Sequence, residues 1–375
     1  MKLPDGWKEV KLGNITKISS GGTPSKENKA FWGDGYPWIS AKDLKQPIVT
    51  DSIDKLTREG YRKANVASKG SLLILTRGMT LHNDVPICIA GKDVAFNQDV
   101  KCLSVIDEID VQYLSYFLKG KKRELLKLVD SAGNGTGRLD TELLKSVAVF
   151  YPPLPEQKAI ADTLSVWDSM IEKTERLVIK KEKLFTFVQK ALFSSISNNH
   201  KKLLKTIADI TKGTQLGKVD MIPRGRYQVI NGGVSASGYT DSWNTDENTI
   251  TISEGGNSCG FINFITENFW AGGHCYTLSI KNTEQVSKEF LYWFLKVNEN
   301  KIMKLRVGSG LPNIQRKDLE QLEIPVCPSE EQISIVQTLE VAQHEIDLLR
   351  QLTDQYKLQK QGLMQKLLTG QWRIK

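Results

Sequence analysis

Few side chains in this sequence have types and spacing that could support metal binding. Cys259, His274 and Cys275 come nearest to a zinc ligand set. Structural zinc, however, takes four nitrogen or sulfur ligands, which usually come in closely spaced pairs, and the sequence contains no Cys-x-x-Cys pair. We therefore expect buried thiols at these positions and no metal site.

Catalytic motifs are equally hard to assemble. Asp5, Glu9 and Lys11 resemble the carboxylate and lysine set of many Mg²⁺-dependent endonucleases, but that chemistry needs groups that converge from adjacent strands. The short spacing between Asp5 and Glu9 leaves no room for a hairpin. The run from Gly133 to Gly137 leads into a short predicted strand, whereas a dinucleotide-binding loop opens a long helix. The sequence thus predicts no catalytic residue.

The composition is that of an ordinary globular protein. The 375 residues carry a formal net charge of +8, and 40% of them are hydrophobic. This length predicts about two or three domains. No run approaches the roughly 18 apolar residues of a membrane span and no secretory signal is visible, so we expect a cytoplasmic protein with reduced cysteines and no membrane partner. The positive charge is compatible with nucleic acid but does not identify it.

The chain contains an internal repeat. Gly133 and Gln157 recur at one constant offset as Gly308 and Gln332, within longer ungapped matches, and the motif LSYFLK recurs as LYWFLK. A repeat of this length indicates two copies of one structural unit. The centres of the copies, residues 36–90 and 227–265, have diverged.

Each copy ends in a predicted long helix. Proline and glycine are absent from 156–212, and only Gly362 interrupts 329–369. Both stretches carry a heptad seam of apolar residues. A rod of about 40 residues would be roughly 60 Å long and would outreach its own domain, so we expect the two seams to pair as an antiparallel coiled coil rather than to pack on their own domains. The seam residues are Ile160, Leu164, Trp167, Ile171, Val178 and Phe185 in the first helix and Ile335, Leu339, Ile346, Leu349, Tyr356 and Leu363 in the second.

Four seam positions are weak, namely Thr174, Lys181, Thr353 and Lys360. They are expected either to fix the register of the two helices or to face a further protein. The predicted fold class is therefore α+β and multidomain, with two tandem pseudo-repeated α/β domains separated by two long helices. The expected boundaries are 1–153, 154–197, 198–326 and 327–375.

The order of several motifs carries a family resemblance. WKEVKLGNITKISSGGTPSK, YPWISAKDL, LILTRG, AFNQDVKCL and PPLPEQKAIADTL follow one another in the first copy, and IADITKGTQ, YQVING, GHCYTL, GSGLPNIQ and PSEEQISIVQTL follow in the second. This order resembles the DNA-specificity subunit of Type I restriction–modification systems. The resemblance covers essentially the whole chain.

The resemblance implies a role and a set of partners. Each α/β unit would be a target recognition domain that reads one half of an asymmetric bipartite site in double-stranded DNA, and the helices would set the spacer and dock two modification (methyltransferase) subunits. The chain itself would bind no cofactor and catalyse nothing. The assembled complex would be an adenine-specific DNA methyltransferase and, with restriction (translocase-nuclease) subunits, a Type I endonuclease, so that S-adenosylmethionine, ATP and Mg²⁺ would belong to the partner subunits. A duplicated coiled-coil adaptor that binds proteins, not DNA, is the alternative.

Polar, aromatic and basic residues gather in the predicted loops of both units. Such side chains contact base edges and phosphates, although surface loops in general contain them too. Glu254 is expected to stand where the first unit has Arg77, which places a shared phosphate contact in doubt at that loop. The candidate DNA contacts are Lys26, Trp38, Lys42, Arg77, Asn97, Gln98 and Arg138 in the first unit and Asn231, Asn257, Ser258, His274, Gln315 and Arg316 in the second.

Overall fold

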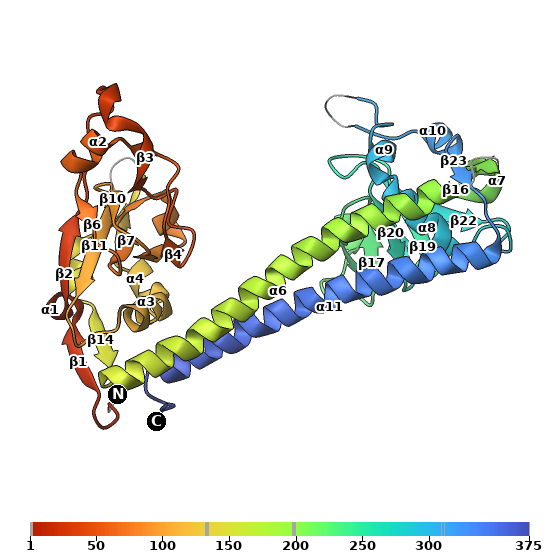
Figure 1. Ribbon diagram of the computed structural model, residues 1–375. Helices are drawn as coiled ribbons and strands as arrows, with labels where there is room; N and C mark the ends of the chain where they lie inside the picture. Colours follow the sequence, from red (N-terminus) through yellow and green to blue (C-terminus); the bar gives the residue numbers. More distant parts are fainter. Residues whose placement is uncertain (1–2, 132–134, 197–199, 309, 311, 375) are drawn as a thin grey trace. The chain divides into compact units, whose positions relative to one another are not determined.

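The computed structural model describes residues 3–131, 135–196, 200–308, 310 and 312–374 (Figure 1). Gly133, where the glycine-rich run of the first copy begins, lies outside the described residues. The chain folds as two units. Unit 1 comprises the residues up to 174 together with those from 352 onward, and unit 2 comprises residues 175–351.

The two long helices are each divided between the units. Helices α6 (Leu154–Ser195) and α11 (Ser329–Leu367) contribute one segment to either unit. The sequence predicts four parts, with each long helix as a part of its own. The structure groups each helix segment with the unit on which it packs, so the boundaries of these four parts stay a prediction.

Unit 1 is built around a five-stranded sheet with the order β2-β11-β7-β9-β4, beside a four-stranded sheet with the order β5-β3-β10-β6. All four residues of β7 are buried, as expected for an apolar strand at the centre of a domain. The strands are β1 (Lys8–Lys11), β2 (Thr16–Ser20), β3 (Trp32–Ile39), β4 (Ile48–Val49), β5 (Lys55–Leu56), β6 (Val66–Ala67), β7 (Leu72–Leu75), β8 (Arg77–Gly78), β9 (Ile87–Ala90), β10 (Val94–Phe96), β11 (Val100–Val105), β12 (Val129–Ser131), β13 (Gly137–Leu139) and β14 (Ala148–Tyr151). The helices before α6 are α1 (Leu12–Ile15), η1 (Lys29–Phe31), α2 (Arg58–Lys63), η2 (Met79–His82), α3 (Val111–Gly120), α4 (Lys122–Leu126) and α5 (Thr141–Lys145).

Unit 2 contains a four-stranded sheet with the order β16-β22-β19-β20 and a three-stranded sheet with the order β18-β17-β21. Its strands are β15 (Lys201–Leu203), β16 (Ala208–Lys212), β17 (Tyr227–Ile230), β18 (Gly238–Thr240), β19 (Thr249–Ser253), β20 (Ile262–Ile265), β21 (Phe269–Ala271), β22 (Cys275–Ile280) and β23 (Glu323–Pro325). Its shorter helices are α7 (Leu204–Ile207), η3 (Lys218–Asp220), α8 (Lys288–Val297), α9 (Glu299–Met303) and α10 (Arg316–Glu320).

The two units share one frame, which confirms the duplication predicted from the sequence. In unit 1, Leu103 of β11 lies between β2 on one side and Leu72 of β7 on the other. In unit 2, Leu278 of β22 lies in the same way between β16 and Ile250 of β19. The strand pairings are antiparallel and follow the same order in both units, so the repeated sequence produces a repeated sheet.

A close approach of two backbone segments is also repeated. A Cβ atom on Gly21 would lie 2.2 Å from the carbonyl oxygen of Asn97, and one on Gly213 would lie 2.4 Å from that of Ala271. Only glycine allows this contact, which brings the segment after β2 or β16 onto the end of the neighbouring small sheet. The Gly-containing loops are therefore held at corresponding places in both units.

Each long helix is tied to its own α/β domain by a buried glutamine in its first turn. The side chain of Gln157 accepts a 2.9 Å hydrogen bond from the Asp110 amide and donates to two backbone carbonyl groups. Gln332 accepts a 2.9 Å bond from the Ser287 amide and likewise donates to two carbonyl groups. The side-chain amide of each glutamine is buried and makes three hydrogen bonds. The two glutamines therefore fix the direction in which the helices leave the sheets.

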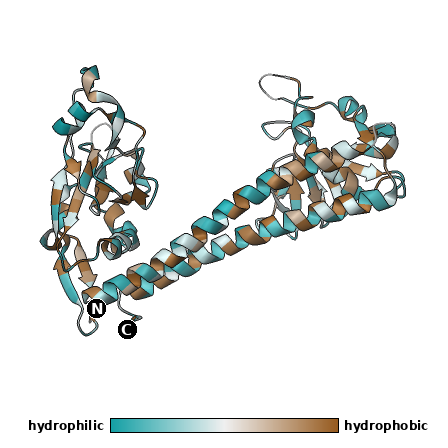
Figure 2. Cartoon of the chain, in the orientation of Figure 1, coloured by the Kyte–Doolittle hydropathy of each residue, from teal (hydrophilic) through white to brown (hydrophobic). Residues whose placement is uncertain are grey.

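The two helices pair within each unit, and apolar residues recur along both of them (Figure 2). In unit 1 the first part of α6 meets the last part of α11, where the rings of Trp167 and Tyr356 pack edge to face with centroids 5.9 Å apart. In unit 2 the later part of α6 meets the first part of α11, where Lys181 and Glu345 form a 2.7 Å ion pair. The segments therefore run antiparallel, which agrees with the expected coiled coil.

All the predicted seam residues are buried or half-buried. Ile160 and Leu164 belong to the core of unit 1, and Ile335 and Leu339 belong to the core of unit 2. The first turns of both helices thus pack on their own domains, and helix–helix pairing begins further along. No helix in the described part of the chain is both long and apolar enough to span a membrane.

Candidate nucleic-acid interface

Two arginines of unit 1 face each other on neighbouring strands. Arg77 of β8 is the direct antiparallel partner of Arg138 of β13, and both side chains are exposed. Side chains of directly opposed residues share one face of a sheet, so two like charges there repel each other. Arg138 has one distant carboxylate neighbour, Asp140 at 3.8 Å, and Arg77 has no ion pair with any described residue. Two exposed guanidinium groups on one face of a sheet can bind an anion such as phosphate.

The same strand bridge occurs in unit 2 without charges. Gly255 pairs antiparallel with Asn313, and Asn313 is the counterpart of Arg138 at the constant offset of the repeat. Gly255 is therefore the counterpart of Arg77. The expectation that Glu254 takes the place of Arg77 is wrong by one residue. The Glu254 carbonyl accepts the bond from the Ile314 amide, just as the carbonyl of Thr76, which precedes Arg77, accepts one from Leu139 in unit 1.

Glu254 instead anchors a polar network below this bridge. Its carboxylate binds Lys212 at 2.6 Å, the Tyr276 hydroxyl at 3.2 Å and Nδ1 of His274 at 3.2 Å. Burial raises the pKa of Glu254, but the hydrogen bond and charge of Lys212 and the bonds from Tyr276 and His274 outweigh it and lower the pKa below its usual value. The residue is a structural anion in unit 2.

Four predicted residues of unit 2 lie at or next to the Gly232 carbonyl and the His274 amide. Asn231 accepts a 3.1 Å hydrogen bond from the backbone amide of His274. The hydroxyl of Ser258 donates to the Gly232 carbonyl at 2.6 Å, and Ser253 donates to the same oxygen. Asn231 and Ser258 therefore hold this turn, while the side chains of His274 and of Asn257 are exposed beside it. The structure thus brings these candidates together.

Comparison with known proteins identifies the family. A family model described as the Type I restriction modification DNA specificity domain matches residues 4–181 and again residues 197–357. The chain belongs to this family.

Similar proteins have the same type of name. A putative type I specificity subunit of Mycoplasma pneumoniae is 34% identical over 174 residues, and that match covers 46% of either chain. A type I restriction enzyme specificity subunit of Escherichia coli is 29% identical over 195 residues, or 50% of this chain and 48% of that one. The matches thus span about half the length of these relatives. A specificity subunit of Methanocaldococcus jannaschii is 23% identical over 422 residues, which cover all of this chain and 95% of that one.

Solved structures share the fold. The S subunit of a Type I restriction-modification system from M. genitalium matches with a TM-score of 0.67 and 20% identity over 98% of both chains. The S subunit from Thermoanaerobacter tengcongensis matches with a TM-score of 0.53 and 17% identity over 99% of both chains. These likenesses support two specificity domains joined by long helices.

Within the first specificity domain, several predicted contacts serve to position the loops. Trp38 is only 4% exposed, and its indole Nε1 donates a 2.9 Å hydrogen bond to the Gly22 carbonyl. Asn97 is 7% exposed, and it accepts a 3.1 Å bond from the Val100 amide. Neither side chain offers surface to a base. The amide of Gln98 accepts a bond from the Thr23 hydroxyl and remains exposed.

The remaining candidates are exposed but differ in their partners. Lys26 has no ion pair with a described residue, whereas Lys42 lies 3.6 Å from Asp54. In the second specificity domain, Arg316 is engaged by Glu320 at 2.7 Å and Gln315 donates to the Asn313 side chain at 3.0 Å. Lys26 is therefore more available to an external anion than the other three.

The sequence-based prediction missed a basic helix of the first specificity domain. Helix α2 has the sequence REGYRK and exposes Arg58, Arg62 and Lys63. The available signal was a threonine at the N-cap, Thr57, followed by three cations within six residues.

The described residues contain no group of three or more histidine, cysteine, aspartate and glutamate side chains that could hold a metal ion. Cys259 and Cys275 are buried free thiols, and burial raises the pKa of Cys275 to about 12. They are thus packing residues, as expected.

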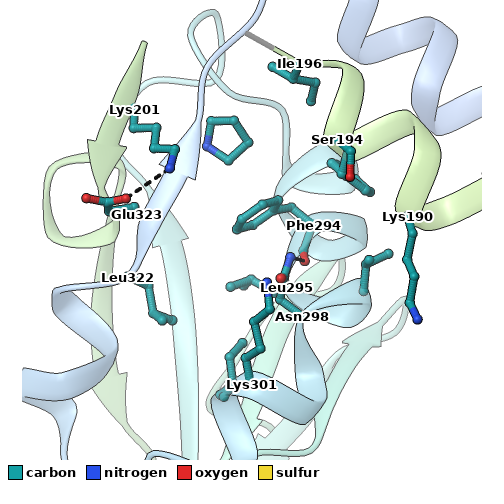
Figure 3. Close-up of a pocket in the computed structure, with 14 residues that line it drawn as sticks. Lys190, Ser194, Ile196, Lys201, Phe294, Leu295, Asn298, Lys301, Leu322 and Glu323 are labelled. Atoms are coloured by element: carbon teal, nitrogen blue, oxygen red, sulfur yellow. Dashed lines mark hydrogen bonds and ion pairs between the residues drawn. The ribbon is translucent and has the colours of Figure 1, made fainter. Parts of the chain in front are cut away.

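The second specificity domain contains a cavity of about 670 Å³ between the end of α6, helices α8 and α9 and strand β23 (Figure 3). Lys190, Lys201 and Lys301 surround an apolar wall that includes Phe294, and Lys201 is bound to the carboxylate of Glu323 at 3.2 Å. Among the described residues, the cavity lining holds no histidine, cysteine or free carboxylate for acid–base or nucleophilic chemistry.

Proposed function

We propose that this chain is the DNA-specificity subunit of a Type I restriction–modification complex. One observation carries the proposal. The two specificity domains share the order of four strands in the main sheet, the same glycine contact and the same glutamine. They differ where side chains reach the surface, as Arg77 and Arg138 differ from Gly255 and Asn313. A repeated frame with divergent surfaces suits two readers of two different half-sites.

In the proposed role, each domain contacts one half-site of a bipartite sequence in double-stranded DNA. Lys26, Arg77 and Arg138 in the first domain would bind phosphates, and the exposed side chain of Gln98 would reach a base edge. In the second domain Asn257 and His274 are the exposed candidates on the turn that Asn231 and Ser258 hold. Trp38 and Asn97 would act indirectly by positioning these loops.

The paired helices would set the distance between half-sites and dock two modification subunits. Several large apolar side chains on them point to solvent, notably Phe187 of α6, which is 69% exposed, and Val341 of α11, which is 70% exposed. In the proposed role these exposed apolar side chains would contact the modification subunits. S-adenosylmethionine, ATP and Mg²⁺ would be bound by the modification and restriction subunits, and the complex would act in the cytoplasm.

Methylome sequencing of the host with and without this chain tests the proposal. We expect adenine methylation at one asymmetric bipartite motif, which disappears when the chain is deleted. The purified chain with S-adenosylmethionine or Mg²⁺ should neither methylate nor cut DNA. Modification or cleavage by the chain alone would overturn the proposal, as would an unchanged methylome after deletion.

A further inference from the structure

The first specificity domain presents a cluster of unpaired cations at some distance in sequence from its β8–β13 bridge. We call this cluster the basic platform. None of its members makes an ion pair with a described residue, and all are exposed. Acidic residues on the same segments, Glu27, Asp34 and Glu59, are fewer, so a positive surplus remains. The basic platform consists of Lys29 on η1 and Arg58, Arg62 and Lys63 on α2.

A small core of its own supports the basic platform. Trp38, Leu56 and Ala95 form this core, and Tyr61 of α2 packs against it. The ring of Tyr61 also stacks on Tyr36 with centroids 4.4 Å apart and an interplanar angle of 20°. The core is separate from the main core of unit 1, and it holds α2 and η1 in place.

The contact between α2 and η1 is close and specific. A Cβ atom on Gly60 would lie 2.2 Å from the Phe31 carbonyl oxygen, so α2 rests directly on the backbone of η1. The Thr57 hydroxyl accepts a 3.2 Å bond from the Gly60 amide and donates a 2.6 Å bond to the Ala30 carbonyl. The cations of both elements are thus carried on one rigid support.

Arg62 and Lys63 lie in the last turn of α2, where cations are favoured, so only Arg58 is placed against the helix dipole. Arg58 and Arg62 are four residues apart on α2, where like charges repel. Arg58 also lies in the first turn, at the end of a helix that favours anions. A short helix that keeps such an arrangement gains stability when an anion binds between the charges.

The second specificity domain has a counterpart of η1, the 3-10 helix η3 between β16 and β17, but among the described residues it has none of α2. Its strand β17 pairs parallel with β21, as β3 pairs parallel with β10 in the first domain. Between β17 and β19, however, the described residues form strand β18 and no helix. The repeated frame therefore forms without α2 and its three cations.

We infer that the basic platform binds the phosphate backbone of the DNA duplex, as a contact of the first domain that the second domain lacks. This inference rests on the proposed function. Arginine and lysine on a rigid support bind successive phosphates without regard to sequence and fix the position of the domain on the duplex. The base-reading loops of the same domain would then act on DNA that is already held.

The test compares two triple variants of the full chain. The platform variant carries Arg58→Gln, Arg62→Gln and Lys63→Gln. The control variant carries Lys8→Gln, Lys122→Gln and Lys145→Gln, which remove equal charge from exposed lysines of the same unit that are already paired with Glu108, Asp84 and Glu142. The affinity of each for a fluorescein-labelled DNA duplex of mixed sequence is measured by anisotropy over a range of salt concentrations.

We expect the slope of log affinity against log salt to become shallower by about 2 to 3 in the platform variant and by less than about 1 in the control, since each phosphate contact contributes roughly 0.9. The melting temperature of the platform variant should change little, because the three exposed cations make no ion pair with a described residue. Equal slopes in both variants, or an unfolded platform variant, would overturn the inference and leave the proposed function intact. If the unaltered chain showed no salt-dependent binding to DNA, the proposed function itself would fail.

Discussion

Arg77 and Arg138 lie directly opposite each other on β8 and β13, and the same bridge in unit 2 joins Gly255 to Asn313. The second unit shows that the bridge forms without charge. The arginines of the first unit therefore repel each other in a bridge that does not need them, and an anion bound between them would relieve this repulsion.

Replacing Arg138 by Asn, the residue of the other unit, tests this relationship. We expect Arg138→Asn to keep or slightly raise the melting temperature and to weaken DNA binding about tenfold at constant salt, since a charge-assisted hydrogen bond contributes on the order of 1.5 kcal/mol or more. The reciprocal change Asn313→Arg should strengthen binding. A lower melting temperature of Arg138→Asn with unchanged affinity would show a structural role instead.

The buried glutamine in the first turn of α6 predicts a loss of stability. Gln157→Leu would leave the Asp110 amide and the carbonyl groups of Glu108 and Pro152 without partners. We expect the free energy of unfolding to fall by roughly 2–4 kcal/mol, because each unsatisfied buried group costs on the order of 1–3 kcal/mol. Gln361→Leu, at an exposed position of α11, is the control and should change little. Denaturant unfolding measures both variants.

Asp168 predicts a strong coupling between the helices in unit 1. Its carboxylate accepts hydrogen bonds from the Tyr116 hydroxyl and from Lys360, whose side chain is only 16% exposed. A double-mutant cycle with Asp168→Asn and Lys360→Met should give a coupling energy of about 1–3 kcal/mol. The exposed pair Lys145 and Glu142 should give about 0.5 kcal/mol or less. Similar coupling in the two cycles would mean that Lys360 does not fix the helix register.

Glu254 predicts a pH dependence of stability. The folded-state pKa lies below the usual value of 4.5, so the carboxylate stabilises the folded state above that pH and the contribution is lost as the pH falls through the folded pKa. Between about pH 6 and pH 3 the unaltered chain should therefore lose more stability than Glu254→Gln. Thermal unfolding across this range measures the difference, with Glu267→Gln as an exposed control. Parallel pH profiles for the unaltered chain and Glu254→Gln would contradict it.

The elements with strong periodicity could be predicted from the sequence. The heptad seams predicted α6 and α11, and the constant offset between matching motifs predicted the repeated sheet. Lys181 and Lys360, weak positions of the seam, proved to be paired with Glu345 and Asp168, which supports the register role over the contact with a further protein. These features depend on local pattern, which a single sequence displays directly.

The details of the interface could not be predicted because they depend on contacts between distant segments. Trp38 was expected at the surface, but its indole is buried against the Gly22 loop. Helix α2 is too short to form by itself, and its position depends on Phe31 and Tyr36.

The misplacement of Glu254 has a similar origin. Ile250 pairs with Leu278 as Leu72 pairs with Leu103, but the segment between the paired strands is shorter in the second copy than in the first. The offset that aligns Leu278 with Leu103 therefore does not align β19 with β7. Only the strand pairing reveals this difference in length.

The unequal charge of the two domains has a kinetic consequence. Long-range attraction by unpaired cations raises the rate of encounter with a polyanion, and that rate falls with ionic strength. The first domain contains two pairs of like charges, Arg77 with Arg138 and Arg58 with Arg62. The second domain has an uncharged bridge in place of the first pair, and the charge of its Glu254 is balanced by Lys212. The first domain would therefore reach DNA before the second. The second half-site would then be tested while the first is already engaged, so recognition would proceed in a preferred order from one end of the bipartite site.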